Sequence, residues 1–181
     1  IDYGALEFII ACCFWQDEAM LEYASDPTKD IHGDMAAKVC SCDRKSVSKE
    51  MRYTAKNQLV FPLLYGSYYV QCAKNICESI DKHKLKLKDG VAVKNHLLDK
   101  KKIGELGACI SREKPKPLTF EAHVKSVEDA FYKQFSTFAE WKEKWWAEYQ
   151  AGGQFRMMTG FLISGKYSKN FLMNAPIQGP G

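Results

Sequence analysis

The chain has 181 residues, of which 46% are hydrophobic and 27% charged, and its formal net charge is +4. This composition is typical of a globular protein and excludes a disordered chain. The sequence also lacks the run of about 18 apolar residues that a membrane-spanning helix requires. The seven cysteines form no Cys-x-x-Cys pair, so we expect reduced thiols in a cytoplasmic setting, acting as small buried hydrophobic side chains.

Helical periodicity and turn residues divide the first half of the chain into short elements. The apolar run over 6–21 is nearly continuous and predicts one largely buried helix. The other expected elements are the end of a strand at 1–3, a turn at 25–28, a short helix over 34–39 with Asp30 or His32 near its start, and a helix capped by Ser46 or Ser48 that ends or bends at Gly66.

The second half contains the clearest periodicity of the chain. Apolar residues recur every three or four positions over 124–149, which predicts one long amphipathic helix or two nearly collinear ones with a core-facing stripe. The other expected elements are helices over 68–80 and 91–98, a turn at 89–90, a break at 114–117, a hairpin within 155–165 and the start of a last helix over 167–173. The expected fold class is mainly α, with a small β component.

Residues 52–66 carry the most informative pattern. Arg52 and Lys56 are four residues apart, as are the aromatic residues Phe61 and Tyr65, and Gly66 follows. A nucleoside triphosphate requires such an arrangement, because cations neutralise its phosphates and a ring shapes the base pocket. The alternative is an ordinary amphipathic helix with a solvated basic turn and a buried aromatic turn.

This pattern resembles motif B of the family A DNA polymerases, the DNA polymerase I class, in which Arg-x-x-x-Lys precedes Phe-x-x-x-Tyr-Gly. Three other blocks follow the family order. Residues 2–8 are similar to motif A, Asp30-Ile-His32 follows at the family spacing, and 174–179 are similar to Asn-x-Pro-Ile-Gln-Gly. Residues 67–118 match only loosely, and the resemblance is closer to phage-type members.

The resemblance implies a fragment of a DNA-directed DNA polymerase that transfers a nucleotide from a dNTP to a primer 3′-hydroxyl. Residues 1–24 would form a palm segment, 25–150 the fingers, and 151–181 a hairpin and the return to the palm. The implied partners are primer-template DNA, dNTPs, the remainder of the polymerase chain and two Mg²⁺ ions, in the cytoplasm or the host cytoplasm of a virus. The alternative is a non-catalytic nucleic-acid-binding module that retains the fingers.

The resemblance also implies a role for each matching residue. Asp2 would be a catalytic residue and would bind Mg²⁺ together with the backbone carbonyl of Tyr3. The implied dNTP contacts are Glu7 as steric gate, His32, Arg52 and Lys56 on the triphosphate, with Lys56 also catalytic, and the rings of Phe61 and Tyr65; the implied DNA contacts are Lys169, Asn174 and Gln178.

The sequence departs from the family pattern in two places that affect activity. The His-Asp-Glu motif that supplies a second metal carboxylate does not occur, so we expect the isolated chain to be inactive. Relatives carry an arginine four residues before the asparagine that corresponds to Asn174. Here that residue is Asn170, and we expect Lys169 to substitute for the arginine.

A third departure predicts a local distortion. Relatives have four residues from the lysine to the aromatic residue, but Lys56 and Phe61 are five apart. In a regular α-helix four steps separate two side chains by about 40° and five steps by about 140°. Pro62 donates no N–H and crowds the carbonyl of Gln58. We therefore predict a π-type turn within 56–62 that returns Arg52, Lys56, Phe61 and Tyr65 to one face.

Overall fold

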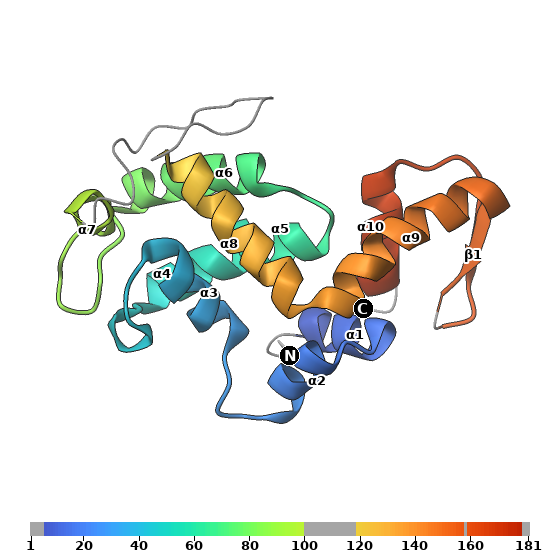
Figure 1. Ribbon diagram of the computed structural model, residues 1–181, viewed down its shortest axis with the longest axis horizontal. Helices are drawn as coiled ribbons and strands as arrows, with labels where there is room; N and C mark the ends of the chain where they lie inside the picture. The colour runs from blue at the N-terminus through green and yellow to red at the C-terminus, as the bar shows by residue number, and fades with distance from the viewer. Residues whose placement is uncertain (1–5, 100–118, 158, 179–181) are drawn as a thin grey trace. The chain divides into compact units, whose positions relative to one another are not determined.

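The computed structural model describes residues 6–99, 119–157 and 159–178, which are mainly helical with one two-stranded antiparallel sheet (Figure 1). No described helix combines the length and the apolar character that crossing a membrane requires. The elements are α1 (Leu6–Trp15), α2 (Glu18–Ser25), α3 (Ile31–Cys40), the 3₁₀ turn η1 (Arg44–Ser46), α4 (Lys49–Ala55), the π-helix η2 (Lys56–Val60), α5 (Phe61–Leu64), α6 (Tyr69–His83), α7 (Val93–Asp99), α8 (Phe120–Gln134), α9 (Ser136–Gly152), β1 (Gln154–Arg156), β2 (Leu162–Ser164) and α10 (Lys169–Gln178).

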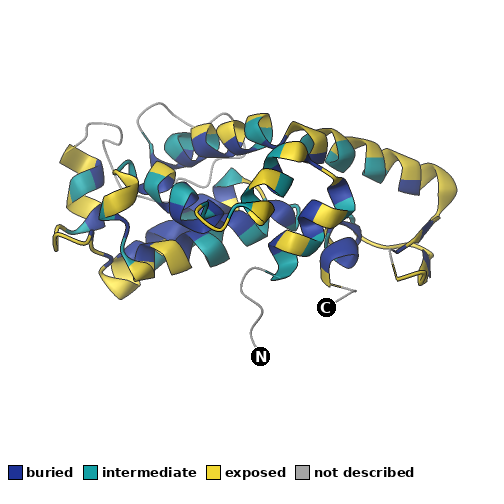
Figure 2. Ribbon diagram, turned by 90° about the horizontal axis from the view of Figure 1, so that it is seen from below, coloured by how far each residue is buried: buried dark blue, intermediate teal, exposed yellow. Residues whose placement is uncertain are grey.

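The chain forms two compact units. Unit 1 comprises Ile1–Lys29, Leu64–Gly66 and Phe131–Gly181, and unit 2 comprises Asp30–Leu63 and Ser67–Ala130. In both units buried and exposed residues alternate around the helices, as amphipathic packing requires (Figure 2). The division into palm and fingers segments at 24 and 150 stays a prediction.

The expectation of a single helix over 6–21 is wrong, because the chain breaks between α1 and α2. Gln16 has a left-handed backbone with φ of 54°. The next residue, Asp17, caps α2, and one carboxylate oxygen accepts a hydrogen bond from the N–H of Met20 at 3.1 Å. Its other oxygen accepts from the N–H of Phe138 in α9, also at 3.1 Å. Two backbone donors thus satisfy a carboxylate that is only 2% exposed.

Helix α1 is buried along one face and not throughout. Phe8, Cys12 and Trp15 lie in the core, whereas Ile9 is 42% exposed and Cys13 is also exposed. The expectation for the cysteines therefore holds for part of the set. None of the cysteines in the described residues forms a disulfide, and the buried ones are Cys12, Cys40, Cys72 and Cys77.

The periodic segment over 124–149 folds as two helices, α8 and α9. They separate at Phe135, whose backbone angles (φ −109°, ψ 63°) are not helical. Phe131, Phe135 and Phe138 are fully buried, which confirms the predicted core stripe. Gly153, with φ of 64°, ends α9 in the left-handed conformation that glycine adopts readily.

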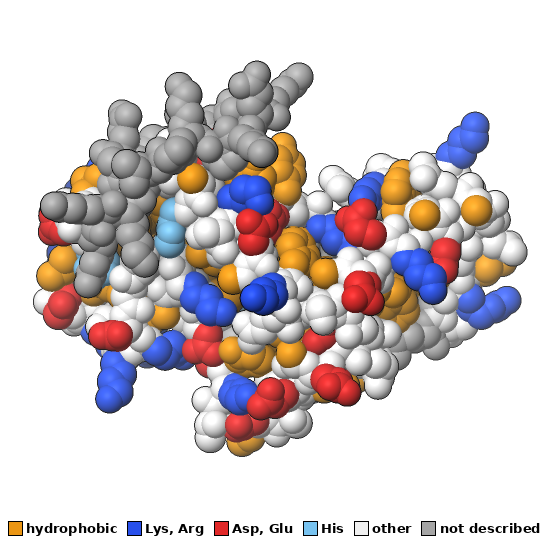
Figure 3. Space-filling view, in the orientation of Figure 1, with side chains coloured by type: hydrophobic (Ala, Val, Ile, Leu, Met, Phe, Trp, Pro, Cys, Tyr) orange, Lys and Arg blue, Asp and Glu red, His pale blue; other side chains and the backbone are white. Residues whose placement is uncertain are grey.

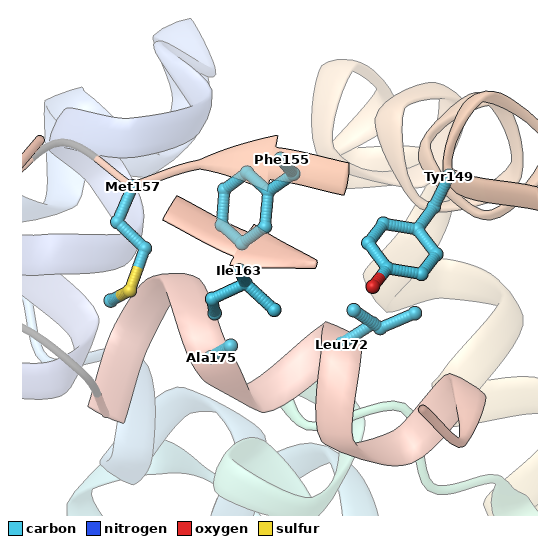
Figure 4. Close-up of a cluster of buried hydrophobic side chains, with 6 residues drawn as sticks. All are labelled: Tyr149, Phe155, Met157, Ile163, Leu172 and Ala175. Atoms are coloured by element: carbon cyan, nitrogen blue, oxygen red, sulfur yellow. The ribbon is translucent and has the colours of Figure 1, made fainter. Parts of the chain in front are cut away.

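The predicted hairpin is confirmed and packs on α10 in unit 1. Phe155 of β1 pairs with Ile163 of β2, and both side chains point toward α10, where Leu172 and Ala175 meet them (Figure 4). The hydroxyl of Tyr149 donates to the carbonyl of Gly165 at 2.9 Å, which ties α9 to the end of the hairpin.

Helix α3 is the centre of unit 2 and packs against α4 and η2 (Figure 1). It runs longer than the predicted 34–39. Its C-terminal carbonyls accept hydrogen bonds from two histidines, His123 of α8 to Val39 and His96 of α7 to Ser41, each at 3.0 Å. These bonds satisfy backbone groups that a helix end leaves without partners.

Helix α4 begins as the sequence predicts. Ser48 is the N-cap, and its hydroxyl accepts from the N–H of Met51 at 3.3 Å. Gly66, with φ of 85°, follows the end of α5, which confirms the stop predicted there.

Candidate functional site

The π-helix η2 occupies the position predicted from the spacing of Lys56 and Phe61. The N–H of Phe61 donates to the carbonyl of Lys56, five residues earlier, instead of to the carbonyl of Asn57. The Lys56 ammonium nitrogen lies 5.1 Å from the centroid of the Phe61 ring. The extra residue is therefore absorbed in the wider turn, and Lys56 and Phe61 lie on one face of the helix.

Arg52, one turn before Lys56, binds the carboxylate of Asp30 at the start of α3. Its Nε donates to Oδ2 of Asp30 at 2.8 Å. The same oxygen accepts from Nη2 of Arg44 at 2.5 Å, and Nε of Arg44 donates to Asp34 at 3.1 Å. Burial raises the pKa of Asp30, but the hydrogen bond from Arg52 and the charges of Arg52 and Arg44 outweigh it and hold the pKa below its usual value. Asp30 is therefore an anion at neutral pH.

Gly33 is needed for this arrangement because the guanidinium of Arg44 lies against the backbone of α3. A Cβ atom at position 33 would overlap the guanidinium. The glycine thus allows Arg44 to reach Asp30 and Asp34 across the first turn of the helix.

His32 lies beside these cations and is 2% exposed. Neither ring nitrogen has a hydrogen-bond partner among the described residues. Its ring stands edge-on to Phe61, with centroids 5.6 Å apart and an interplanar angle of 89°. Burial lowers the pKa of His32 to about 4, and the charges of Arg52 and Lys56 also lower it, against the opposing effect of Asp30. The imidazole is therefore neutral at pH 7.

The structure thus brings four of the predicted dNTP contacts together in unit 2, namely the triphosphate contacts His32, Arg52 and Lys56 and the ring of Phe61. Tyr65 belongs to unit 1. Burial raises the pKa of Tyr65, a hydrogen bond with Gln178 lowers it, and the carboxylate of Glu7 raises it. Glu7, Tyr65 and Gln178 therefore form a second group of predicted residues.

The predicted DNA contacts lie on α10. Asn174 and Gln178 are four residues apart and share a face, where they line a groove together with the stacked rings of Tyr167 and Phe171, whose centroids are 4.5 Å apart. Lys169 lies about 140° around the helix axis from Asn174, because five residues separate them.

The residues expected to bind Mg²⁺, Asp2 and Tyr3, lie outside the described residues. Within the described ranges, no group of three or more His, Cys, Asp or Glu side chains is arranged to hold a metal ion.

Asp30 and Arg44 were not among the predicted site residues. Both lie next to Arg52, and Asp30 is the centre of the salt bridges there. Arg44 lies in the polar stretch between the two helices predicted over 34–39 and after Ser46 or Ser48, 14 positions after Asp30. No local spacing rule links the two positions. On the face seen in Figure 3 basic and acidic side chains are interspersed, with no continuous basic patch.

No model of a known protein family matches the chain, and a search of curated proteins finds no significant match.

Proposed function

We propose that this chain contributes the dNTP-binding helices of a family A DNA-directed DNA polymerase, with unit 2 as the triphosphate-binding part. The observation that carries the proposal is the π-helix. The motif spacing is one residue too long for a regular helix, and the wider turn returns Lys56 and Phe61 to the same face. The distortion, which Pro62 also favours, thus gives these two residues the shared face that a nucleotide site requires.

The chemistry of the cluster supports the same function. Arg52 and Lys56 supply fixed positive charge, and the guanidinium of Arg52 can donate two parallel hydrogen bonds to a phosphate. The neutral His32 lies beside them, and its ring nitrogens have no hydrogen-bond partner in the part of the chain that the structure describes. Phe61 provides an apolar ring next to the lysine. Phosphate oxygens would thus meet the two cations and the imidazole, and the base would meet the apolar ring.

In the proposed enzyme, DNA would contact Asn174 and Gln178 in unit 1. Asp2 and the carbonyl of Tyr3 would hold Mg²⁺, together with carboxylates from the rest of the polymerase. When bound, such ions activate the primer hydroxyl and stabilise the leaving pyrophosphate. Glu7 would then exclude a ribose 2′-hydroxyl.

The test is a calorimetric titration of the chain with dATP in the presence of Mg²⁺. We expect Arg52→Ala and Lys56→Ala each to weaken dATP binding by about tenfold, since each removes a charge-assisted phosphate contact. Lys82→Ala is the matched control, because it removes the same charge from an exposed position on α6 and should change the affinity by less than about twofold.

If the chain is instead a non-catalytic nucleic-acid-binding module, a different result is expected for the chain and these variants. It would bind single-stranded DNA with no measurable affinity for dATP, and Arg52→Ala would then affect DNA binding only. That pattern would replace the polymerase proposal with the module.

A further inference from the structure

The carboxylate of Asp30 joins two arginines that come from different elements. Arg44 in η1 and Arg52 in α4 both donate to the same oxygen, Oδ2, at 2.5 and 2.8 Å. The two guanidinium groups therefore converge on one anionic oxygen atom. Their side chains remain 43% and 46% exposed, so both are accessible to a dissolved anion.

The surroundings of this oxygen favour an anion. Asp30 is the N-cap of α3, a helix of ten residues, so the carboxylate lies at the positive end of the helix dipole. His32 in the first turn is almost completely buried, and both its nitrogens lack hydrogen-bond partners among the described residues. Buried polar groups usually have a hydrogen-bond partner, and a phosphate oxygen could supply one to this ring.

Arg44 would keep its position if the bond to Asp30 were broken. Its Nε also donates to Asp34 at 3.1 Å, and its guanidinium lies against the backbone at Gly33. An incoming anion can therefore replace Asp30 as the partner of Nη2 while Asp34 holds the side chain in place.

We propose that Arg44 is a further phosphate-contacting residue of the triphosphate site, and that Asp30 occupies the place of a phosphate oxygen until the nucleotide displaces it. This inference rests on the proposed function and deepens it. Arg44 and Arg52 would grip the triphosphate from two sides, and the Asp30 carboxylate would set the affinity by competing for both arginines.

The experiment measures binding of dATP and of inorganic tripolyphosphate, each with Mg²⁺, to the chain and its variants. Arg44→Ala should weaken binding of both ligands by about tenfold, because the contact is to phosphate and not to the base. Arg44→Gln keeps most of the side-chain length and should weaken both to a similar extent. Lys45→Ala is the control, since it removes an exposed charge from the same turn and should cost less than about twofold.

Asp30→Asn tests the competition directly. It preserves the shape of the side chain but removes its charge, so we expect both ligands to bind about three- to tenfold more tightly. Circular dichroism and urea unfolding of each variant show whether it is folded.

Each outcome decides the proposal. If Arg52→Ala weakens binding but Arg44→Ala behaves like Lys45→Ala, the role of Arg44 is overturned and the proposed function stands. Unchanged or weaker binding by Asp30→Asn overturns the competition. If the unaltered chain binds neither ligand, both this inference and the proposed function fail.

Discussion

Deletion of Asn57 in a Pro62→Ala background should leave unit 2 folded, whereas deletion of Asn75 in the same background should unfold it. Both asparagines are partly buried and lie within helices. Asn57 is in the π-helix, where removal of one residue converts the wide turn to a regular one and keeps the faces on either side in register. Asn75 is in the regular helix α6, where a deletion rotates the following residues by about 100°.

The size of the difference follows from the buried residues of α6. Deletion of Asn75 would turn Ile76, Cys77 and Ile80 away from the core face set by Val70 and its neighbours. Loss of several buried aliphatic contacts costs on the order of 3–5 kcal/mol. Deletion of Asn57 removes a partly buried amide whose Nδ2 donates to the carbonyl of Tyr53, and it should cost about 1 kcal/mol or less.

The Pro62→Ala background is needed because the proline fits only beside the π-turn. In a regular helix its ring would meet the carbonyl of Gln58, at a cost of about 3 kcal/mol. Urea unfolding, monitored by circular dichroism, gives the free energy of unfolding of Pro62→Ala alone and with either deletion. A deletion of Asn57 as damaging as that of Asn75 in the Pro62→Ala background would contradict the account of the π-turn.

Acid should destabilise the chain through His32. The pKa of His32 is about 4 in the folded protein, against 6.5 for the unperturbed residue, so the unfolded chain binds the extra proton first. The stability that the neutral ring contributes is present above pH 6.5 and is lost as the pH falls toward 4. From pH 7 to pH 4 this loss is about 3 kcal/mol.

The measurement compares unfolding free energies of the chain, His32→Gln and His83→Gln at several pH values. His32→Gln lowers stability at pH 7 because it changes a buried side chain. Between pH 7 and pH 4, however, it should lose about 3 kcal/mol less unfolding free energy than the unaltered chain. His83 is exposed on α6 and serves as the control. Equal pH dependence in all three proteins would show that His32 is not buried in the neutral form.

Local chemistry was sufficient for several elements. The cap at Ser48, the stop at Gly66 and the hairpin before α10 depend on residues within a few positions of each other. The π-turn was also predictable, because the spacing of Lys56 and Phe61 and the position of Pro62 conflict with a regular helix.

Long-range contacts account for what the sequence did not reveal. The break between α1 and α2 depends on Asp17 accepting from Phe138, which lies 121 residues away. The salt bridges of Asp30 join residues 14 and 22 positions later, with no helical spacing to indicate them. For the candidate site, the motif therefore predicted the group around Lys56. The position of Arg44 next to Asp30 depends on how α3 packs against its neighbours and could not be predicted from the motif.

The most direct test of the proposed triphosphate site follows the imidazole resonances of His32 by NMR over a series of pH values, without dATP and with saturating dATP and Mg²⁺. A bound triphosphate brings negative charge next to the ring and stabilises the imidazolium, so the pKa of His32 should rise above its value of about 4 at saturation. At each pH the resonances of His83 should be the same with and without dATP. If dATP saturates the chain while the pKa and resonances of His32 stay unchanged, or if no binding occurs at all, unit 2 is not the triphosphate-binding part of a polymerase.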